Sequence, residues 1–229
     1  MRRFSIIIAA LTVISLISPA SARAVRDFFA SEPGIVFPLL PVNTRLDMLD
    51  YFDNGQIVSA TNNLGNDTQI ISLDSTFLSV QTSECRTVEL RMFTPSAHDT
   101  VIAVIETVEL PMADSRISFY DRNWKLLQTS KFITPPTMAD FFTKATPRGK
   151  RADLLSSIDF PLIKLMFKGK AHDVVVAKSG LKDFYSPIDY KRFEPTRSTD
   201  ENLICANNNL SHTTHNATTS RPHTTHNPA

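Results

Sequence analysis

The sequence predicts an α+β protein in which an antiparallel β-meander sheet packs against two helical segments. Three patterns lead to this fold class. In residues 88–92 (VELRM), apolar and charged side chains alternate, as they do in a strand with one solvated face. Residues 101–105 are apolar throughout, which is typical of a central strand covered on both faces. Leu46, Leu49 and Phe52 recur at helical spacing, so a helix is expected before the strands.

Two helices open the predicted fold. Residues 24–31 form a short amphipathic helix, which Pro33 ends. A second helix is expected to start at Asn43, because its side chain can accept an unpaired backbone N–H at the helix start. This helix runs to about Phe52, and the following Asn-Gly pair at Gly55 ends it.

Short strands joined by tight turns are expected next. Residues 63–66 (NLGN) and 121–123 (DRN) are turn sequences. Successive strands with such short connections form an antiparallel meander. The expected strands are residues 57–61, 68–73, 77–82, 88–92, 101–105, 116–120 and 124–127.

A second helical segment is predicted after the two prolines at 135–136. Thr137 and Asp140 have the spacing of a capping box, which predicts a short helix. A longer helix is expected over about 152–168, and Pro161 should kink or split it because proline lacks a backbone N–H. One or two further strands are expected at residues 174–176 and 188–193.

The two helical segments echo each other weakly. In both, the letters DFF precede the pattern R-x-D-x-L, at residues 27–49 and at residues 140–155. The echo would make residues 24–130 and 135–197 two halves of a duplicated unit. Chance similarity is the preferred alternative, because short amphipathic helices share this pattern generically.

The first residues predict export. Arg2 and Arg3 form a short positive region, residues 4–17 carry no charge, and small residues follow up to Ala22. This order is typical of a secretory signal peptide, and the apolar run is short for a membrane-spanning helix. Residues 1–22 are therefore expected to be removed, which leaves a periplasmic or secreted protein with no membrane insertion. An uncleaved membrane anchor is the alternative.

Composition limits what the remaining chain can bind. Loss of Arg2 and Arg3 changes the formal net charge from +1 to −1, which argues against a nucleic-acid partner. The hydrophobic fraction of 42% is enough for a core, and residues 23–197 are expected to form a single α+β domain. With only 6 glycines there is little room for glycine-rich phosphate loops, and no cofactor is expected.

The end of the chain differs in composition from the body. Residues 198–229 are rich in Asn, Thr, His and Ser and are predicted to be a low-complexity, disordered tail. The tail contains two His-x-x-His pairs, whose imidazoles could bind Zn, Cu or Ni. A solvated tail is the preferred interpretation, because no acidic or cysteinyl ligand completes a metal site nearby. The candidate metal ligands are His212, His215, His223 and His226.

No catalytic constellation stands out in the sequence. The chain lacks a Gly-x-Ser-x-Gly elbow and a His-Glu-x-x-His helix. Asp47, Asp50 and Asp53 recur every third residue and could bind a hard cation, but a solvated helix face is the preferred interpretation. Cys85 and Cys205 could form a disulfide in an oxidising compartment or remain two thiols, and the sequence does not decide between these states.

Several spaced motifs resemble one known family. They are residues 43–50 (NTRLDMLD), 61–65 (TNNLG), 87–91 (TVELR) and 114–120 (DSRISFY), the last followed by Trp124. Together they resemble the domain of unknown function 3256 family, small exported proteins of Bacteroidales, over about residues 24–195. The resemblance implies a Gram-negative host and a periplasmic or exported location. The family has no assigned activity, so it implies no catalytic residues.

The absence of a catalytic motif favours a non-enzymatic binding or interaction module. The solvated face of the predicted sheet would receive an envelope protein or a glycan. A cell-envelope hydrolase with an unrecognised active site is the alternative hypothesis.

Overall fold

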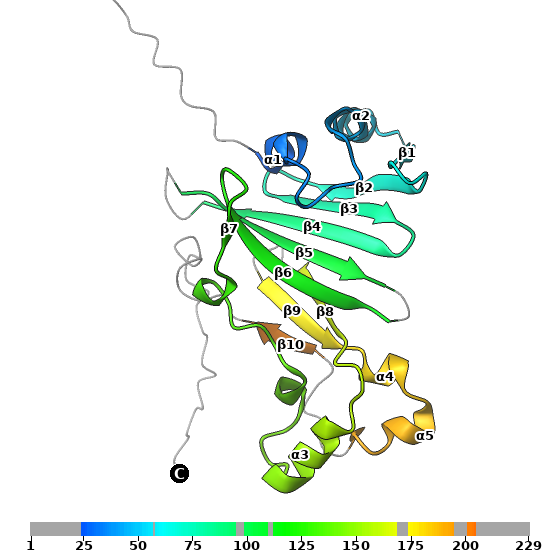
Figure 1. Ribbon diagram of the computed structural model, residues 1–229, viewed down its shortest axis with the longest axis vertical. Helices are drawn as coiled ribbons and strands as arrows, with labels where there is room; N and C mark the ends of the chain where they lie inside the picture. The colour runs from blue at the N-terminus through cyan, green and yellow to red at the C-terminus, as the bar shows by residue number, and fades with distance from the viewer. Residues whose placement is uncertain are drawn as a thin grey trace, which may run out of the picture.

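The computed structural model describes residues 24–56, 58–94, 99–109, 112–168 and 174–194, together with the backbone of 201–204. Within these residues the chain forms two antiparallel sheets and several short helices (Figure 1). This arrangement confirms the predicted α+β class and the antiparallel meander.

The larger sheet is the meander. Its seven strands are hydrogen-bonded in chain order, and each pairs antiparallel with the next. The strands are β1 (Ala60–Thr61), β2 (Asp67–Leu73), β3 (Phe77–Ser83), β4 (Arg86–Phe93), β5 (Val101–Val108), β6 (Asp114–Asp121) and β7 (Leu126–Leu127).

A smaller sheet of three strands lies below the larger one in Figure 1. Its strand order is β10-β9-β8, and both pairings are antiparallel. The strands are β8 (Ile163–Lys168), β9 (Val174–Ser179) and β10 (Glu201–Ile204).

Short helices occupy the rest of the described chain. The helices α1 and α2 lie together beside the β1–β2 side of the larger sheet (Figure 1). The helical elements are α1 (Val25–Ser31), α2 (Val42–Asp53), α3 (Arg148–Ser156), α4 (Leu181–Phe184), α5 (Pro187–Tyr190) and the 3-10 helices η1 (Thr129–Lys131) and η2 (Met138–Phe141).

Two apolar cores cover the two faces of the larger sheet. On strand β5, Ile102 and Val104 join the core that includes α1 and α2, while Ala103 and Ile105 join the core that includes β8 and β9. All four side chains are almost completely buried. The uninterrupted apolar run of β5 therefore reflects a central strand covered on both faces, as predicted.

The smaller sheet contacts the larger one through backbone as well as apolar groups. The N–H of Leu165 donates to Oγ of Ser115 at 2.9 Å, and the N–H of Phe167 donates to Oε2 of Glu89 at 3.0 Å. These two backbone N–H groups, at alternate residues of β8, need no acceptor on a further strand, because polar side chains of the larger sheet accept their hydrogen bonds.

The predicted helix over residues 152–168 is wrong in its second half. The helix α3 ends at Ser156, and residues 163–168 form strand β8. Pro161 interrupts the chain between them, and the side chains of Ile163, Leu165 and Phe167 alternate onto the core. In so short a segment, side chains that alternate between core and solvent favour a strand when a neighbouring sheet covers the inward-facing ones.

The strand predicted at residues 188–193 is also wrong. The segment begins with helix α5, in which Ser186 caps the helix by accepting the N–H of Asp189 at 3.2 Å and Pro187 occupies the first turn. Proline at this position fits a helix start because no partner for its missing N–H is needed there. The capping box of Thr137 and Asp140 is confirmed, at the start of η2 rather than of an α-helix.

Three other boundaries differ from the prediction. Helix α2 begins after Pro41 with no side-chain cap, so Asn43 lies inside the helix and does not cap it. Strand β1 is limited to Ala60–Thr61. Strand β10 falls inside the segment expected to be a polar tail (198–229), because Leu203 and Ile204 pair with β9 there. The duplication of residues 24–130 and 135–197 stays a prediction.

Candidate functional site

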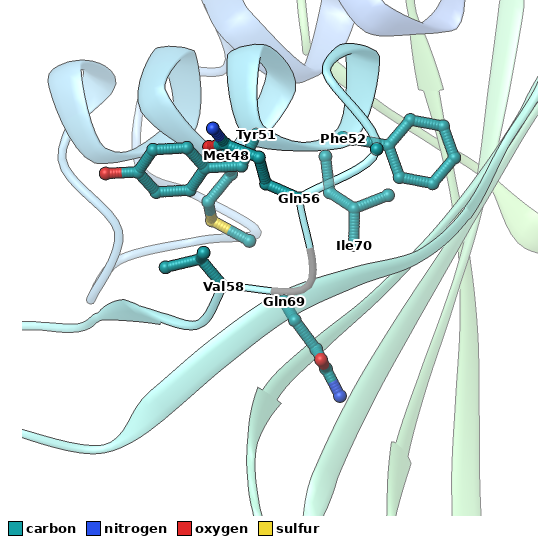
Figure 2. Close-up of a pocket in the computed structure, with 8 residues that line it drawn as sticks. Met48, Tyr51, Phe52, Gln56, Val58, Gln69 and Ile70 are labelled. Carbon is teal, nitrogen blue, oxygen red and sulfur yellow. The ribbon is translucent and has the colours of Figure 1, made fainter.

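An apolar groove separates the end of helix α2 from strand β2. Its volume is about 330 Å³. Figure 2 shows α2 along one side of the groove and β2 along the other. The lining residues come from α2, from the loop that follows it and from β2: Met48, Tyr51, Phe52, Gly55, Gln56, Val58, Gln69 and Ile70.

The loop after α2 closes one side of the groove. Gly55 adopts the left-handed conformation with φ of 63°, which ends the helix at little steric cost. The N–H of Gln56 then donates to the carbonyl oxygen of Tyr51 at 2.9 Å, which turns the chain back under the helix. The turn brings Val58 to the groove with half of its surface exposed.

Strand β2 supplies the opposite side. Ile70 points toward α2, whereas Gln69 points away from the helix in Figure 2, as successive side chains of a strand must. The amide of Gln69 donates to Oε1 of Gln81 on β3 at 3.1 Å, so it is held on the far face of the sheet. Thr68 donates to the carbonyl oxygen of Ala60 at 3.3 Å, which ties β1 to the start of β2.

The outer edge of β2 is open beside the groove. Strand β1 pairs only with Asp67 and Thr68, and no other described strand pairs with that side of β2. The stretch from Gln69 to Leu73 thus has backbone groups directed away from β3 with no neighbouring strand. A register shift between Ile70 and Ser72 leaves Ile71 about half exposed at this edge.

A buried ion pair fixes the helix that forms the groove. Nη1 of Arg45 on α2 lies 2.9 Å from Oε2 of Glu32, and the two side chains are 2% and 0% exposed. A second guanidinium nitrogen donates to the backbone oxygen of Glu32. Burial lowers the pKa of Arg45, and the adjacent Glu32 carboxylate opposes this effect. The Glu32 carboxylate also accepts backbone N–H groups from Gly34, Ile35, Val36 and Phe37.

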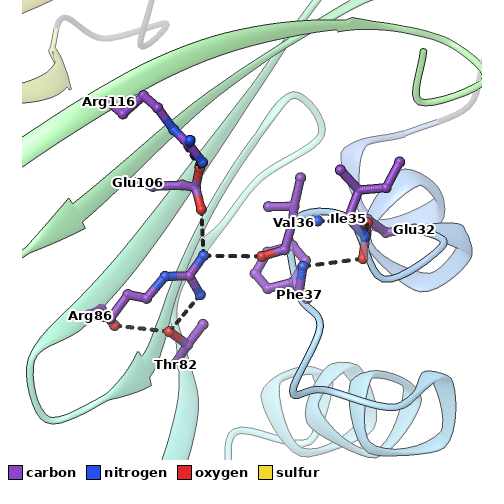
Figure 3. Close-up of polar contacts among 8 residues, drawn as sticks. All are labelled: Glu32, Ile35, Val36, Phe37, Thr82, Arg86, Glu106 and Arg116. Carbon is purple, nitrogen blue, oxygen red and sulfur yellow. Dashed lines mark hydrogen bonds and ion pairs between the residues drawn. The ribbon is translucent and has the colours of Figure 1, made fainter. Parts of the chain in front are cut away.

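A second polar cluster attaches the loop of residues 32–37, which contacts the Glu32 carboxylate, to the larger sheet (Figure 3). Arg86 lies 2.6 Å from Glu106 and donates to the carbonyl oxygen of Val36 at 3.1 Å. Arg116 contacts the other oxygen of the same carboxylate. Burial raises the pKa of Glu106, but hydrogen bonds from Arg116 and Arg86 outweigh burial, so its pKa lies below the ordinary value. Both clusters therefore hold residues 32–37 in place.

Glu89 is a half-buried carboxylate at the contact of the two sheets, and its pKa is raised. Burial is the main cause; the N–H of Phe167 and the charge of Lys164 act in the opposite direction. The contacts of Glu89 are those of a hydrogen-bond acceptor for β8. We therefore assign it a structural role.

The candidate residues chosen from the sequence do not form this site. The tail histidines His212, His215, His223 and His226 lie outside the described residues, as does Cys205, so the alternative of a disulfide to Cys85 or two thiols stays open. Within the described part of the chain no group of three or more His, Cys, Asp or Glu is arranged to hold a metal ion.

The acidic residues of α2 are placed as a solvated face. Asp47, Asp50 and Asp53 are all exposed, and Asp53 pairs with Arg26 at 2.6 Å. The sequence predicts the helix α2 but not the groove. Val58 and Ile70 come to lie beside α2 only because the chain turns back after the helix to form β2. One signal was present in the sequence, a local excess of acidic residues over residues 27–85.

Comparison with known proteins places the chain in a family. Residues 17–195 match the model of a family described as "Protein of unknown function (DUF3256)". The chain belongs to this DUF3256 family. The result confirms the resemblance drawn from the spaced motifs of the sequence. A search of curated proteins found no match.

A solved structure shares the fold of this DUF3256 protein. It is described as the structure of a domain of an uncharacterized protein from Porphyromonas gingivalis W83. The identity is 22%, the TM-score is 0.67, and the match covers 80% of this chain and 97% of the other. At this identity the similarity establishes the fold alone. No helix in the described part of the chain combines the length and the apolar character needed to cross a bilayer.

Proposed function

We propose that this DUF3256 protein is an exported, non-enzymatic binding module that holds a partner in the groove between α2 and β2. The first residues support export, because Arg2, Arg3 and the uncharged run to Ala22 have the order of a signal peptide. A periplasmic or secreted location follows from that pattern.

The chemistry of the groove supports binding over catalysis. Its eight lining side chains include no carboxylate, imidazole or thiol. A hydrolytic site needs a nucleophile and a general base within hydrogen-bond reach of each other, and these residues supply no such pair. They supply instead an apolar surface with the amide of Gln56 and the phenol of Tyr51, since the amide of Gln69 is held on the far face of the sheet. This composition is expected of a site that recognises shape and backbone polarity.

The observation that carries the proposal is the combination of groove and open strand edge. Val58 lines the groove, and Ile71 directly follows the lining residue Ile70 on β2. About half of the surface of each is exposed, although both are large apolar residues. Exposed apolar residues gathered beside a concave surface mark interaction sites more often than residues scattered singly.

The test is a selection from a library of short random peptides against the mature chain, followed by affinity measurement with two variants. Val58→Glu places a charge in the groove, and Leu126→Glu places the same charge on β7, where Leu126 is 63% exposed. We expect Val58→Glu to weaken the selected peptides about tenfold, or about 1.4 kcal/mol, and Leu126→Glu to leave them unchanged. Equal affinity for both variants would show that the groove is not the binding surface.

A further inference from the structure

The surface around the groove is strongly acidic. Residues 27–85 contain eight Asp or Glu residues and a single cationic side chain, Arg45. Arg45 is buried and paired with Glu32, so it contributes nothing to the surface. Arg26, just before this segment on α1, is partly exposed and pairs with Asp53, which leaves the other carboxylates to make the surface acidic. Residues 86–194 contain 17 Lys or Arg and 13 Asp or Glu residues. The net charge of the whole chain is near zero, but it is distributed unevenly. The helices α1 and α2 and the strands β1 to β3 lie on the acidic side.

The acidic residues surround the open edge of β2. Asp67 begins the strand and Asp74 directly follows it, and both are exposed. On α2, Asp47 is exposed as well, next to Met48 and one helical turn before Tyr51, both of which line the groove. A ligand that lies along β2 would thus have carboxylates at each end and along one side.

The edge itself offers backbone hydrogen bonds. Beyond Thr68 no described strand covers the outer side of β2, and residues 67–73 contain no lysine or proline, the residues that commonly block an exposed strand edge. An added strand would gain main-chain hydrogen bonds here, and its side chains facing the helix would lie beside Ile70 and Val58. An extended segment of five residues spans about 16 Å, which matches the stretch from Gln69 to Leu73.

We infer that the partner held by this site is an extended, cationic polypeptide segment of another protein, which pairs with the outer edge of β2 and places apolar side chains in the groove. The inference rests on the proposed function and specifies its ligand. Cationic residues at the ends of the segment face Asp67 and Asp74, and those beside the helix face Asp47. A second copy of this chain is disfavoured as the occupant, because edge-to-edge pairing of two β2 strands would bring two acidic surfaces together.

The test uses three blocked synthetic peptides with alternating valine and threonine. The first carries lysines at both ends, the second carries glutamates there, and the third is the lysine peptide with N-methylated backbone amides that cannot pair with a strand. Binding to the mature chain is measured by fluorescence anisotropy at low and high salt. Amide hydrogen exchange of residues 69–73 is measured with and without the lysine peptide.

We expect the lysine peptide to bind at least tenfold more tightly than either of the other two, to weaken as salt rises, and to protect the amides of residues 69–73. The double variant Asp47→Asn, Asp67→Asn should weaken binding severalfold, whereas Asp153→Asn on the exposed surface of α3 should not. Asp153→Asn removes one exposed carboxylate on another element, so it is the matched control for each of the single variants Asp47→Asn and Asp67→Asn, which are measured beside the double variant.

Four results would overturn the inference. Equal binding of the lysine and glutamate peptides would refute a cationic partner, and equal binding of the N-methylated peptide would refute strand addition. A dimer detected by sedimentation that protects residues 69–73 would identify a second copy as the occupant. If library-selected peptides bind at Val58 while the lysine peptide does not, this inference fails and the proposed function stands.

Discussion

The buried pair of Glu32 and Arg45 allows the sharpest test of how the groove is held together. In the variant Arg45→Met, the methionine retains much of the apolar stem, so packing changes little. The variant removes both guanidinium hydrogen bonds to Glu32 and leaves a carboxylate with 0% exposure without its counter-ion. Loss of one partner from a buried pair typically costs about 3–5 kcal/mol.

The structure places the expected value at the lower end of that range. The Glu32 carboxylate keeps four backbone N–H donors, from Gly34 to Phe37, and these continue to stabilise its charge. We therefore expect a loss of about 3 kcal/mol in the free energy of unfolding, which for a protein of this size lowers Tm by about 6–12 °C.

The assay is urea unfolding at neutral pH, with Arg26→Met as the matched control. Arg26 forms an ion pair with Asp53 of nearly the same geometry, 2.6 Å, but its side chain is 42% exposed, so its loss should cost less than about 1 kcal/mol. In the double variant Glu32→Gln, Arg45→Met, no charge remains buried, and its stability should exceed that expected from the sum of the single changes. If Arg45→Met costs no more than Arg26→Met, burial of the pair does not set its energetic role.

Three further predictions concern pH and the loop of the groove. Burial raises the pKa of Glu89 above its ordinary value of 4.5, so the wild-type protein loses stability as pH rises from that value through the folded-state pKa. The free energy of unfolding of Glu89→Gln relative to wild type should therefore increase over the same pH range. A difference that does not change with pH would contradict this. The control is Glu84→Gln in an exposed turn. Hydrogen bonds from Arg116 and Arg86 outweigh burial and lower the pKa of Glu106. Its carboxylate therefore stabilises the fold at a pH above the unfolded-state pKa, and this stabilisation is lost as pH falls through the folded-state pKa. Glu106→Gln should cost about 1.5 kcal/mol at neutral pH and progressively less in acid, as measured by urea unfolding across pH. Gly55→Ala should cost about 1 kcal/mol and weaken groove ligands, because φ of 63° strains any residue with a Cβ; an unchanged Cm would refute the assigned strain.

The elements with a clear local period were predicted correctly. Residues 88–92 alternate cleanly and lie in β4, and the apolar run 101–105 lies in the centre of β5. The prediction of a helix through residues 163–168 is wrong, although a split at Pro161 was expected. The sheet that covers Ile163, Leu165 and Phe167 decided in favour of the strand.

The groove could not be predicted in the same way. Met48 and Ile70 are far apart in the chain, and they meet only because the turn at Gly55 returns the chain beneath α2. The excess of acidic residues in 27–85 was readable from the sequence, but its relation to an open strand edge was not. That relation depends on β1 being too short to cover β2.

The sequence by itself determined the order and type of most elements, because hydrophobic periodicity and capping act over a few neighbouring residues. It also determined the family, through motifs spaced along the chain. Only the tertiary structure decided which charges are buried and which backbone groups stay exposed. Glu32 meets Arg45, and no other described strand covers the outer edge of β2 beyond Thr68, because segments distant in sequence pack together and the burial of each polar group depends on that packing.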